Sequence, residues 1–208
     1  RWITDDENVE EIIRDFYRHN ILEKKFNPYF NTRAGDHSAT IRLGILAEQL
    51  TKCSESLRPI IEEIIHSDIG MLLDKNVYRK GHNHGLIADT ALLKMALSSP
   101  KWKKYVPEKE IIDRGKETIA MMFHDNGLTK EHSLSYQLWN ANFALEFIDV
   151  ATSYGFSVNN PSREPLLEMT KKLISNFTYT EGFQFALGDS FRYHNTNLIK
   201  KIYGENFI

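Results

Sequence analysis

The sequence has few of the features that mark specialised classes of protein. It contains one cysteine, Cys53, among 208 residues, which excludes a disulfide within the chain and a zinc site with cysteine ligands. It has no apolar stretch long enough to cross a bilayer and no signal peptide. Because the chain begins at Arg1 rather than at a methionine, we treat it as a fragment or a mature form.

An excess of one charge is lacking as well. The 26 basic and 28 acidic residues leave a formal net charge of -2, and 41% of the residues are hydrophobic. These totals indicate neither a nucleic-acid binder nor a disordered chain, so any attraction for a polyanion must come from a local patch. Repeats, low-complexity linkers and strand patterns are missing, apart from a short alternating run at residues 183–186. We therefore expect one all-α domain over residues 1–208.

Helical periodicity covers most of the chain. One-sided apolar patterns predict amphipathic helices over residues 6–22, 56–73, 107–123 and 161–177. Residues 83–98 and 133–154 are apolar nearly all round, which predicts helices buried on most sides. Residues 39–51 predict a further inner helix that Asp36 or Ser38 could cap, and residues 189–203 a last one. This alternation predicts a ring of inner helices with amphipathic partners outside it.

Polar clusters precede each of the helices that we place inside the ring. They are Asp36-His37, His82-Asn83-His84, the run from Glu131 to Tyr136, and Gly188-Asp189-Ser190. The inner helices of a ring of hairpins run in one direction, so we expect these clusters to meet at one rim. Helix N-termini present unpaired N–H groups and positive dipole ends, which favour a carboxylate or sulfate ligand there.

The same residues carry a resemblance to a known family. The matching segments are D-H-S-A-T-I-R at residues 36–42, N-H-G at 83–85, the run from Asp125 to Tyr136, and G-D-S at 188–190. In this ordered set the chain resembles the helical N-terminal domain of the heparinase II/III and alginate lyase polysaccharide lyases. The resemblance implies an incomplete (α/α) toroid that is normally followed by a β-sandwich domain, which these 208 residues do not include.

The chemistry that this resemblance implies is β-elimination at a uronic acid in an acidic polysaccharide, without a cofactor or a metal ion. Asn83 and His84 would hold the sugar carboxylate and offset its charge while an enolate-like charge grows on it. Tyr136 would donate a proton to the leaving O4 oxygen and, in one substrate geometry, also act as the base. The family usually draws a further catalytic His or Tyr from the β-sandwich domain.

Further residues are candidates for binding the substrate rather than for chemistry. We assign this role to Arg33, Arg79, His82, Glu131, Trp139 and Asp189. The expected partners are the acidic polysaccharide and the β-sandwich domain of the same longer chain, with no nucleic acid and no membrane span. The resemblance favours a periplasmic or secreted location.

Other interpretations stay open at this point. Asn83 is an ordinary helix-capping residue type, His84 could be a structural histidine, and Tyr136 a half-buried core aromatic. A zinc site from His82, His84, His124 and His132 would need ligands at poor spacing. A glycoside hydrolase on a similar barrel would use paired carboxylates, drawn from Asp36, Asp125, Glu131 and Asp189. A helical glycan-binding module without catalysis is the remaining alternative.

Overall fold

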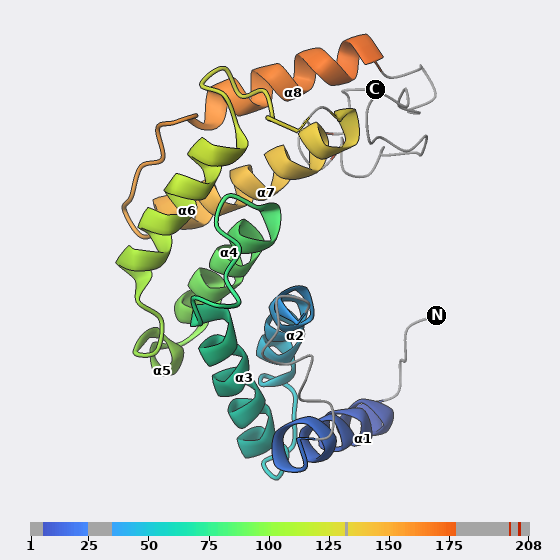
Figure 1. The fold of residues 1–208 in the computed structure, drawn as a ribbon. Coiled ribbons are helices and arrows are strands. Elements are labelled where there is room, and N and C mark those ends of the chain that lie inside the picture. Colours follow the sequence, from blue (N-terminus) through green and yellow to red (C-terminus); the bar gives the residue numbers. More distant parts are fainter. Residues whose placement is uncertain (1–5, 25–34, 132, 178–199, 201–203, 205–208) are drawn as a thin grey trace. The chain divides into compact units, whose positions relative to one another are not determined.

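The computed structural model of this chain describes residues 6–24, 35–131, 133–177, 200 and 204. In order, the elements are α1 (Asp6–Phe16), the π-helical turn η1 (Tyr17–Leu22), α2 (Asp36–Gln49), α3 (Arg58–Leu73), α4 (Asn83–Ser98), α5 (Pro100–Lys103), α6 (Glu108–Met122), α7 (Leu134–Ser153) and α8 (Arg163–Phe177) (Figure 1). The described part has no strand, only an isolated antiparallel bridge between Phe123 and Thr129. The all-α prediction is therefore confirmed.

The predicted helices agree closely with the observed ones. The bounds of α4 are those predicted. Both α4 and α7 have buried residues on most sides, as expected. The short helix α5 was not predicted, and it begins where Ser99 accepts a hydrogen bond from the backbone N–H of Lys101. The strand expected at residues 183–186 and the last expected helix lie outside the described residues.

Helix ends follow local chemistry, with one exception. Proline occupies the first turn of α3, where its missing N–H costs nothing, and Gly155 follows α7 with a positive φ of 79°. The prediction that Asp36 or Ser38 caps α2 is wrong, because the helix already begins at Asp36 and has Gly35 as its N-cap. The Asp36 carboxylate instead accepts from the backbone N–H of His37 at 2.6 Å.

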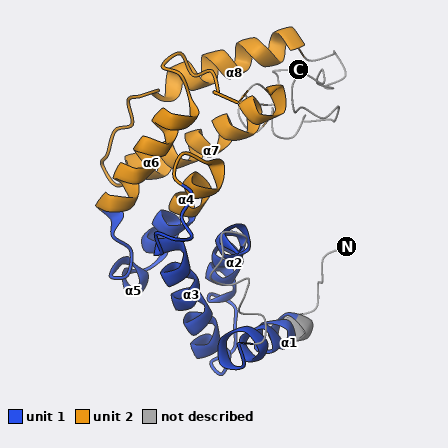
Figure 2. Ribbon diagram, in the orientation of Figure 1, with its two compact units in different colours: residues 1–79, 91–108 blue, residues 80–90, 109–208 orange. Residues whose placement is uncertain are grey.

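The chain divides into two compact units (Figure 2). Unit 1 contains residues 1–79 and 91–108, and unit 2 contains residues 80–90 and 109–208. The incomplete toroid and the single domain both remain predictions, because each concerns how the two units are arranged. Among the described residues, no helix combines the length and apolarity needed to span a membrane.

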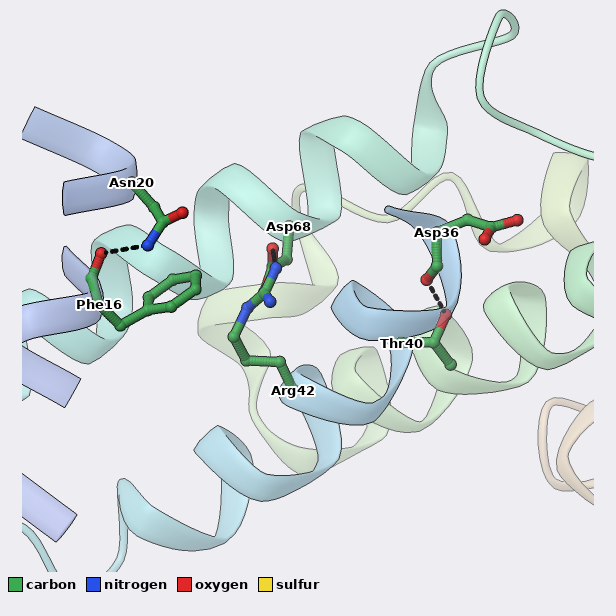
Figure 3. Close-up of polar contacts among 6 residues, drawn as sticks. All are labelled: Phe16, Asn20, Asp36, Thr40, Arg42 and Asp68. Atoms are coloured by element: carbon green, nitrogen blue, oxygen red, sulfur yellow. Dashed lines mark hydrogen bonds and ion pairs between the residues drawn. The ribbon is translucent and has the colours of Figure 1, made fainter. Parts of the chain in front are cut away.

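In unit 1, a buried ion pair joins α2 to α3 (Figure 3). Arg42 donates to both carboxylate oxygens of Asp68, at 2.8 and 2.5 Å, and its guanidinium lies 4.6 Å from the centre of the Phe16 ring. The Asp68 side chain is fully buried. Burial raises the pKa of Asp68 to about 6, and the hydrogen bonds and charge of Arg42 oppose this rise.

One burial prediction for unit 1 is wrong. We expected α2 to be an inner helix, yet Ile41 and Ile45 are 52% and 54% exposed. Leu43 and Leu46 are buried, so the helix is one-sided. We placed the helix inside because of its position in the order of helices and the polar cluster ahead of it. Neither feature shows how many faces of a helix find partners, and α2 packs on α3 with one face.

Unit 2 contains the start of α4 together with α6, α7 and α8. Asp89 of α4 is fully buried and pairs with Arg114 of α6 at 2.5 Å. Gly115 of α6 faces the fully buried ring of Phe147 in α7 so closely that a Cβ atom there would lie 2.2 Å from the ring. Helices α7 and α8 pack on each other. A hydrogen bond between Asn83 and Asn140 joins the start of α4 to the first half of α7.

Candidate functional site

The N-terminus of α4 is capped by His82, not by Asn83. The His82 backbone carbonyl accepts from the N–H groups of Gly85 and Leu86, at 3.0 and 3.3 Å. The Nδ1 atom of its ring accepts from the backbone N–H of His84 at 3.2 Å, so the neutral ring carries its proton on Nε2. The rings of His82 and His84 meet edge to face at 4.9 Å. His82 therefore has a structural task that the sequence did not reveal.

The Asn83 side chain is consequently available for another contact. Its Nδ2 donates to Oδ1 of Asn140, in the second turn of α7, at 3.2 Å. Its own Oδ1 is buried and has no hydrogen-bond partner among residues 6–24, 35–131 and 133–177. An N-capping Asn would accept from a backbone N–H of the first turn, so the capping interpretation of Asn83 is wrong.

The chain of amides continues from Asn140 to the loop ahead of α7. Asn140 is fully buried, and its Nδ2 donates to Oε1 of Glu131 at 3.3 Å and to Oγ1 of Thr129 at 3.4 Å. Glu131 is exposed. The result is a continuous hydrogen-bonded path from an exposed carboxylate through two asparagines to the start of α4.

Gln137 holds this loop in place. Its Oε1 accepts from the backbone N–H of Thr129 at 2.7 Å, while its Nε2 donates to the carbonyl of Gly127 at 3.0 Å and to Oγ1 of Thr170 in α8 at 2.9 Å. Gln137 is only 2% exposed. Because every strong hydrogen-bonding group of the buried amide is used, the loop is tied to both α7 and α8.

The loop also depends on glycine at position 127. Gly127 has a φ of 83°, which L side chains rarely adopt. A Cβ atom there would lie 2.2 Å from the backbone carbonyl oxygen of Pro165 in the first turn of α8. The close approach of α8 therefore shapes the segment that carries Thr129 and Glu131.

Tyr136 lies in the first turn of α7, close to this path. Ser133 caps the helix, and its Oγ accepts from the backbone N–H of Tyr136 at 3.3 Å. The half-buried Tyr136 ring meets the Trp139 ring edge to face, with 5.7 Å between their centres. Since residues four apart share a helix face, Tyr136 and Asn140 lie on the same side of α7, one turn apart.

The remaining candidates are not brought into this cluster by the described contacts. Arg79 and Asp36 belong to unit 1, where the Arg79 Nε lies 3.1 Å from Oδ2 of the buried Asp36. The Arg79 guanidinium is therefore paired with a carboxylate of this chain rather than left for a substrate carboxylate. Arg33, His132 and Asp189 lie outside the described residues. His124 and Asp125 are exposed in the turn that precedes Gly127.

Metal binding finds no support in the part of the chain that the structure describes. No group of three or more His, Cys, Asp or Glu side chains there has the geometry to hold a metal ion. Of the histidines considered for zinc, His82 uses Nδ1 as the α4 cap, and His132 lies outside the described residues.

The sequence interpretation missed Asn140 and Gln137. Both are polar residues in a helix that otherwise reads as core, and both are almost completely buried. Buried amides are rarely left without partners, so their positions in an apolar helix were the available signal. Gln137 is one residue and Asn140 four residues from Tyr136, so the sequence already placed both near the candidate site.

No protein-family model, curated protein or solved structure matches this chain. The resemblance to the polysaccharide lyases thus rests on the sequence segments at residues 36–42, 83–85, 125–136 and 188–190.

Proposed function

We propose that this chain is the helical domain of a polysaccharide lyase that cleaves a uronate-containing acidic glycan by β-elimination. The observation that carries the proposal is the hydrogen bond between the amide of Asn83 and Asn140. Asn140 lies one helical turn from Tyr136 on the same side of α7. An amide suited to a carboxylate and a phenol suited to a leaving oxygen therefore occupy one neighbourhood, although they are far apart in the sequence.

The proposed reaction needs both groups. In β-elimination, a base removes the C5 proton, the electrons of the C5–H bond form the C4–C5 double bond, and the C4–O4 bond breaks. O4 leaves with a proton supplied by Tyr136. The C5 proton is only weakly acidic because its neighbour is a carboxylate, so Asn83 and His84 offset the carboxylate charge.

The base depends on the stereochemistry of the sugar. Where the C5 proton and O4 lie on one face, a deprotonated Tyr136 takes the proton from C5 and returns it to O4. Where they lie on opposite faces, a second residue must remove the proton, and the family resemblance assigns that residue to the β-sandwich domain. Trp139 packs edge to face on the Tyr136 ring, which limits the orientations available to the phenol.

The experiment is to incubate the full-length protein with alginate, heparan and other uronate polymers and to follow ultraviolet absorbance. Elimination creates a conjugated double bond that absorbs, whereas hydrolysis does not. Tyr136→Phe should abolish turnover and keep polymer binding, because it removes only the proton donor. Tyr154→Phe, at the opposite end of α7, is the matched control and should leave turnover unchanged.

Two results would redirect the proposal. New reducing ends without ultraviolet absorbance would identify a hydrolase, and the carboxylates Asp125 and Glu131 would then be the residues to substitute. Binding of an acidic glycan without any turnover by the full-length protein would identify a non-catalytic binding module. An active Tyr136→Phe variant would remove Tyr136 from the mechanism.

A further inference from the structure

The path from Glu131 to Asn83 has a defined direction. An ionised carboxylate only accepts hydrogen bonds, so the NH2 group of Asn140 must face Glu131, in agreement with the 3.3 Å contact. The carbonyl oxygen of Asn140 then faces Asn83 and requires the Asn83 NH2 group, as the 3.2 Å contact shows. The Thr129 hydroxyl fixes the same direction, because it donates to the carbonyl of Met122 and accepts from the Asn140 NH2 group at 3.4 Å. Glu131 and Thr129 together thereby determine the orientation of the Asn83 amide.

In the part of the chain that the structure describes, no hydrogen bond on the other side of Asn83 provides this orientation. Its Oδ1 is buried and accepts no hydrogen bond from a described residue, so no described donor holds the amide in one of its two flipped states. If the amide turned over, its oxygen would face the Asn140 oxygen and a hydrogen bond would become a repulsive contact. Among the described residues, the hydrogen bond to Asn140 is the contact that distinguishes the two states.

We propose that Asn140 is a positioning residue that orients the Asn83 amide, with its own direction set by the two acceptors Glu131 and Thr129. Asn140 takes one of the two N–H groups of Asn83, and the second is the group from which a substrate carboxylate accepts. The catalytic consequence rests on the proposed function, because it assumes that Asn83 binds the sugar carboxylate. The orientation itself does not depend on any substrate.

The orientation can be measured by nuclear magnetic resonance of the side-chain amide signals in the 208-residue chain. Glu131→Gln should shift the Asn83 side-chain signals and speed the hydrogen exchange of this NH2 group, because it removes the charged one of the two acceptors that fix the orientation of Asn140. Glu168→Gln, which makes the same change at an exposed position of α8, should leave these signals in place. Because Glu131 is exposed, its replacement avoids a loss of folding.

A reversed pair supplies the rescue. Asn140→Asp alone places two carboxylates against each other and should displace the Asn83 signals. Adding Glu131→Gln restores the pattern, since the glutamine NH2 donates to Asp at position 140, whose other oxygen accepts from Asn83. Recovery in the double variant distinguishes positioning from simple packing, which the reversal would not restore.

The kinetic test uses the full-length protein with the uronate polymer that it cleaves. Asn140→Ala should lower kcat about a hundredfold, the effect of a displaced catalytic group, with a smaller change in KM, and the reversed pair should recover part of this loss. Unchanged Asn83 signals in both Glu131→Gln and Asn140→Ala would overturn the inference. Absence of turnover in the wild type would instead count against the proposed function, while the resonance measurement would still decide the orientation.

Discussion

Substitution of Gly115 by alanine tests the packing of α6 on α7. In an exposed helix, this change stabilises the folded state by about 0.5–1 kcal/mol, because glycine loses more backbone entropy on folding. At position 115, however, the new Cβ atom would lie 2.2, 2.4 and 3.0 Å from three atoms of the Phe147 ring. Carbon atoms attract each other best at about 3.5–4.0 Å, so the ring or the helix must move by more than about 1 Å.

The Phe147 side chain is completely buried, so the surrounding core residues restrict the movement of its ring. Overpacking of this kind costs about 1–3 kcal/mol, which exceeds the gain in helix propensity. We therefore expect Gly115→Ala to lower the free energy of unfolding by about 1–2 kcal/mol. The assay is urea unfolding followed by far-ultraviolet circular dichroism.

Two comparisons make this result decisive. Gly70 of α3 is exposed, and no atom lies within 4 Å of the place where an added methyl group would sit, so Gly70→Ala should raise stability by about 0.5–1 kcal/mol. Phe147→Leu frees space beside position 115, so combined with Gly115→Ala it should destabilise less than the sum of the single changes, by about 0.5–3 kcal/mol of coupling. The reasoning is refuted if Gly115→Ala stabilises the chain as Gly70→Ala does.

Three further predictions concern the site loop and the buried charge. Gly127→Ala should cost at least about 2 kcal/mol in urea unfolding, because it adds a collision with Pro165 to a positive φ, whereas Gly155→Ala carries only the strain of its φ, about 1 kcal/mol. Ser133→Ala removes the cap of α7 and should lower the unfolding free energy by about 0.5–2 kcal/mol. The pKa of Asp68 rises from 3.8 to about 6 on folding, which means that the folded state binds a proton more tightly than the unfolded state. Protonation of Asp68 therefore stabilises the folded state fully below pH 3.8, and this contribution is lost as the pH rises through about 6. Relative to Asp68→Asn, wild-type stability should fall by about 3 kcal/mol between about pH 4 and pH 7, and a difference independent of pH would contradict this.

Much of the secondary structure could be predicted because helical periodicity is a local property. The bounds of α4, the proline in the first turn of α3 and the end of α7 just before Gly155 all follow from residues within one or two turns. The same reasoning failed at α2, where Ile41 and Ile45 are exposed. Hydrophobicity alone does not say which of two apolar faces will find a partner.

The candidate site was predictable only in part. The sequence indicated the polar run from Glu131 to Tyr136 at the start of a buried helix, and the structure shows that Ser133 of this run caps α7. It did not indicate that His82 would cap α4 and release Asn83, because both residue types occur at helix starts. Glu131 was expected near a helix start. Its hydrogen bond to Asn140 depends on how the loop before α7 folds back onto the second turn of that helix.

By itself, the sequence determined an all-helical chain, the positions of most helices and a set of polar residues at helix starts, since these depend on spacing along one segment. Only the tertiary structure decided which buried amides pair with which partners. Asn83 meets Asn140, and Gln137 meets Thr170, because α4, α7 and α8 bring together residues that no local pattern relates. A buried polar group must find its hydrogen-bond partner wherever the fold supplies one, and that partner is a property of the packing.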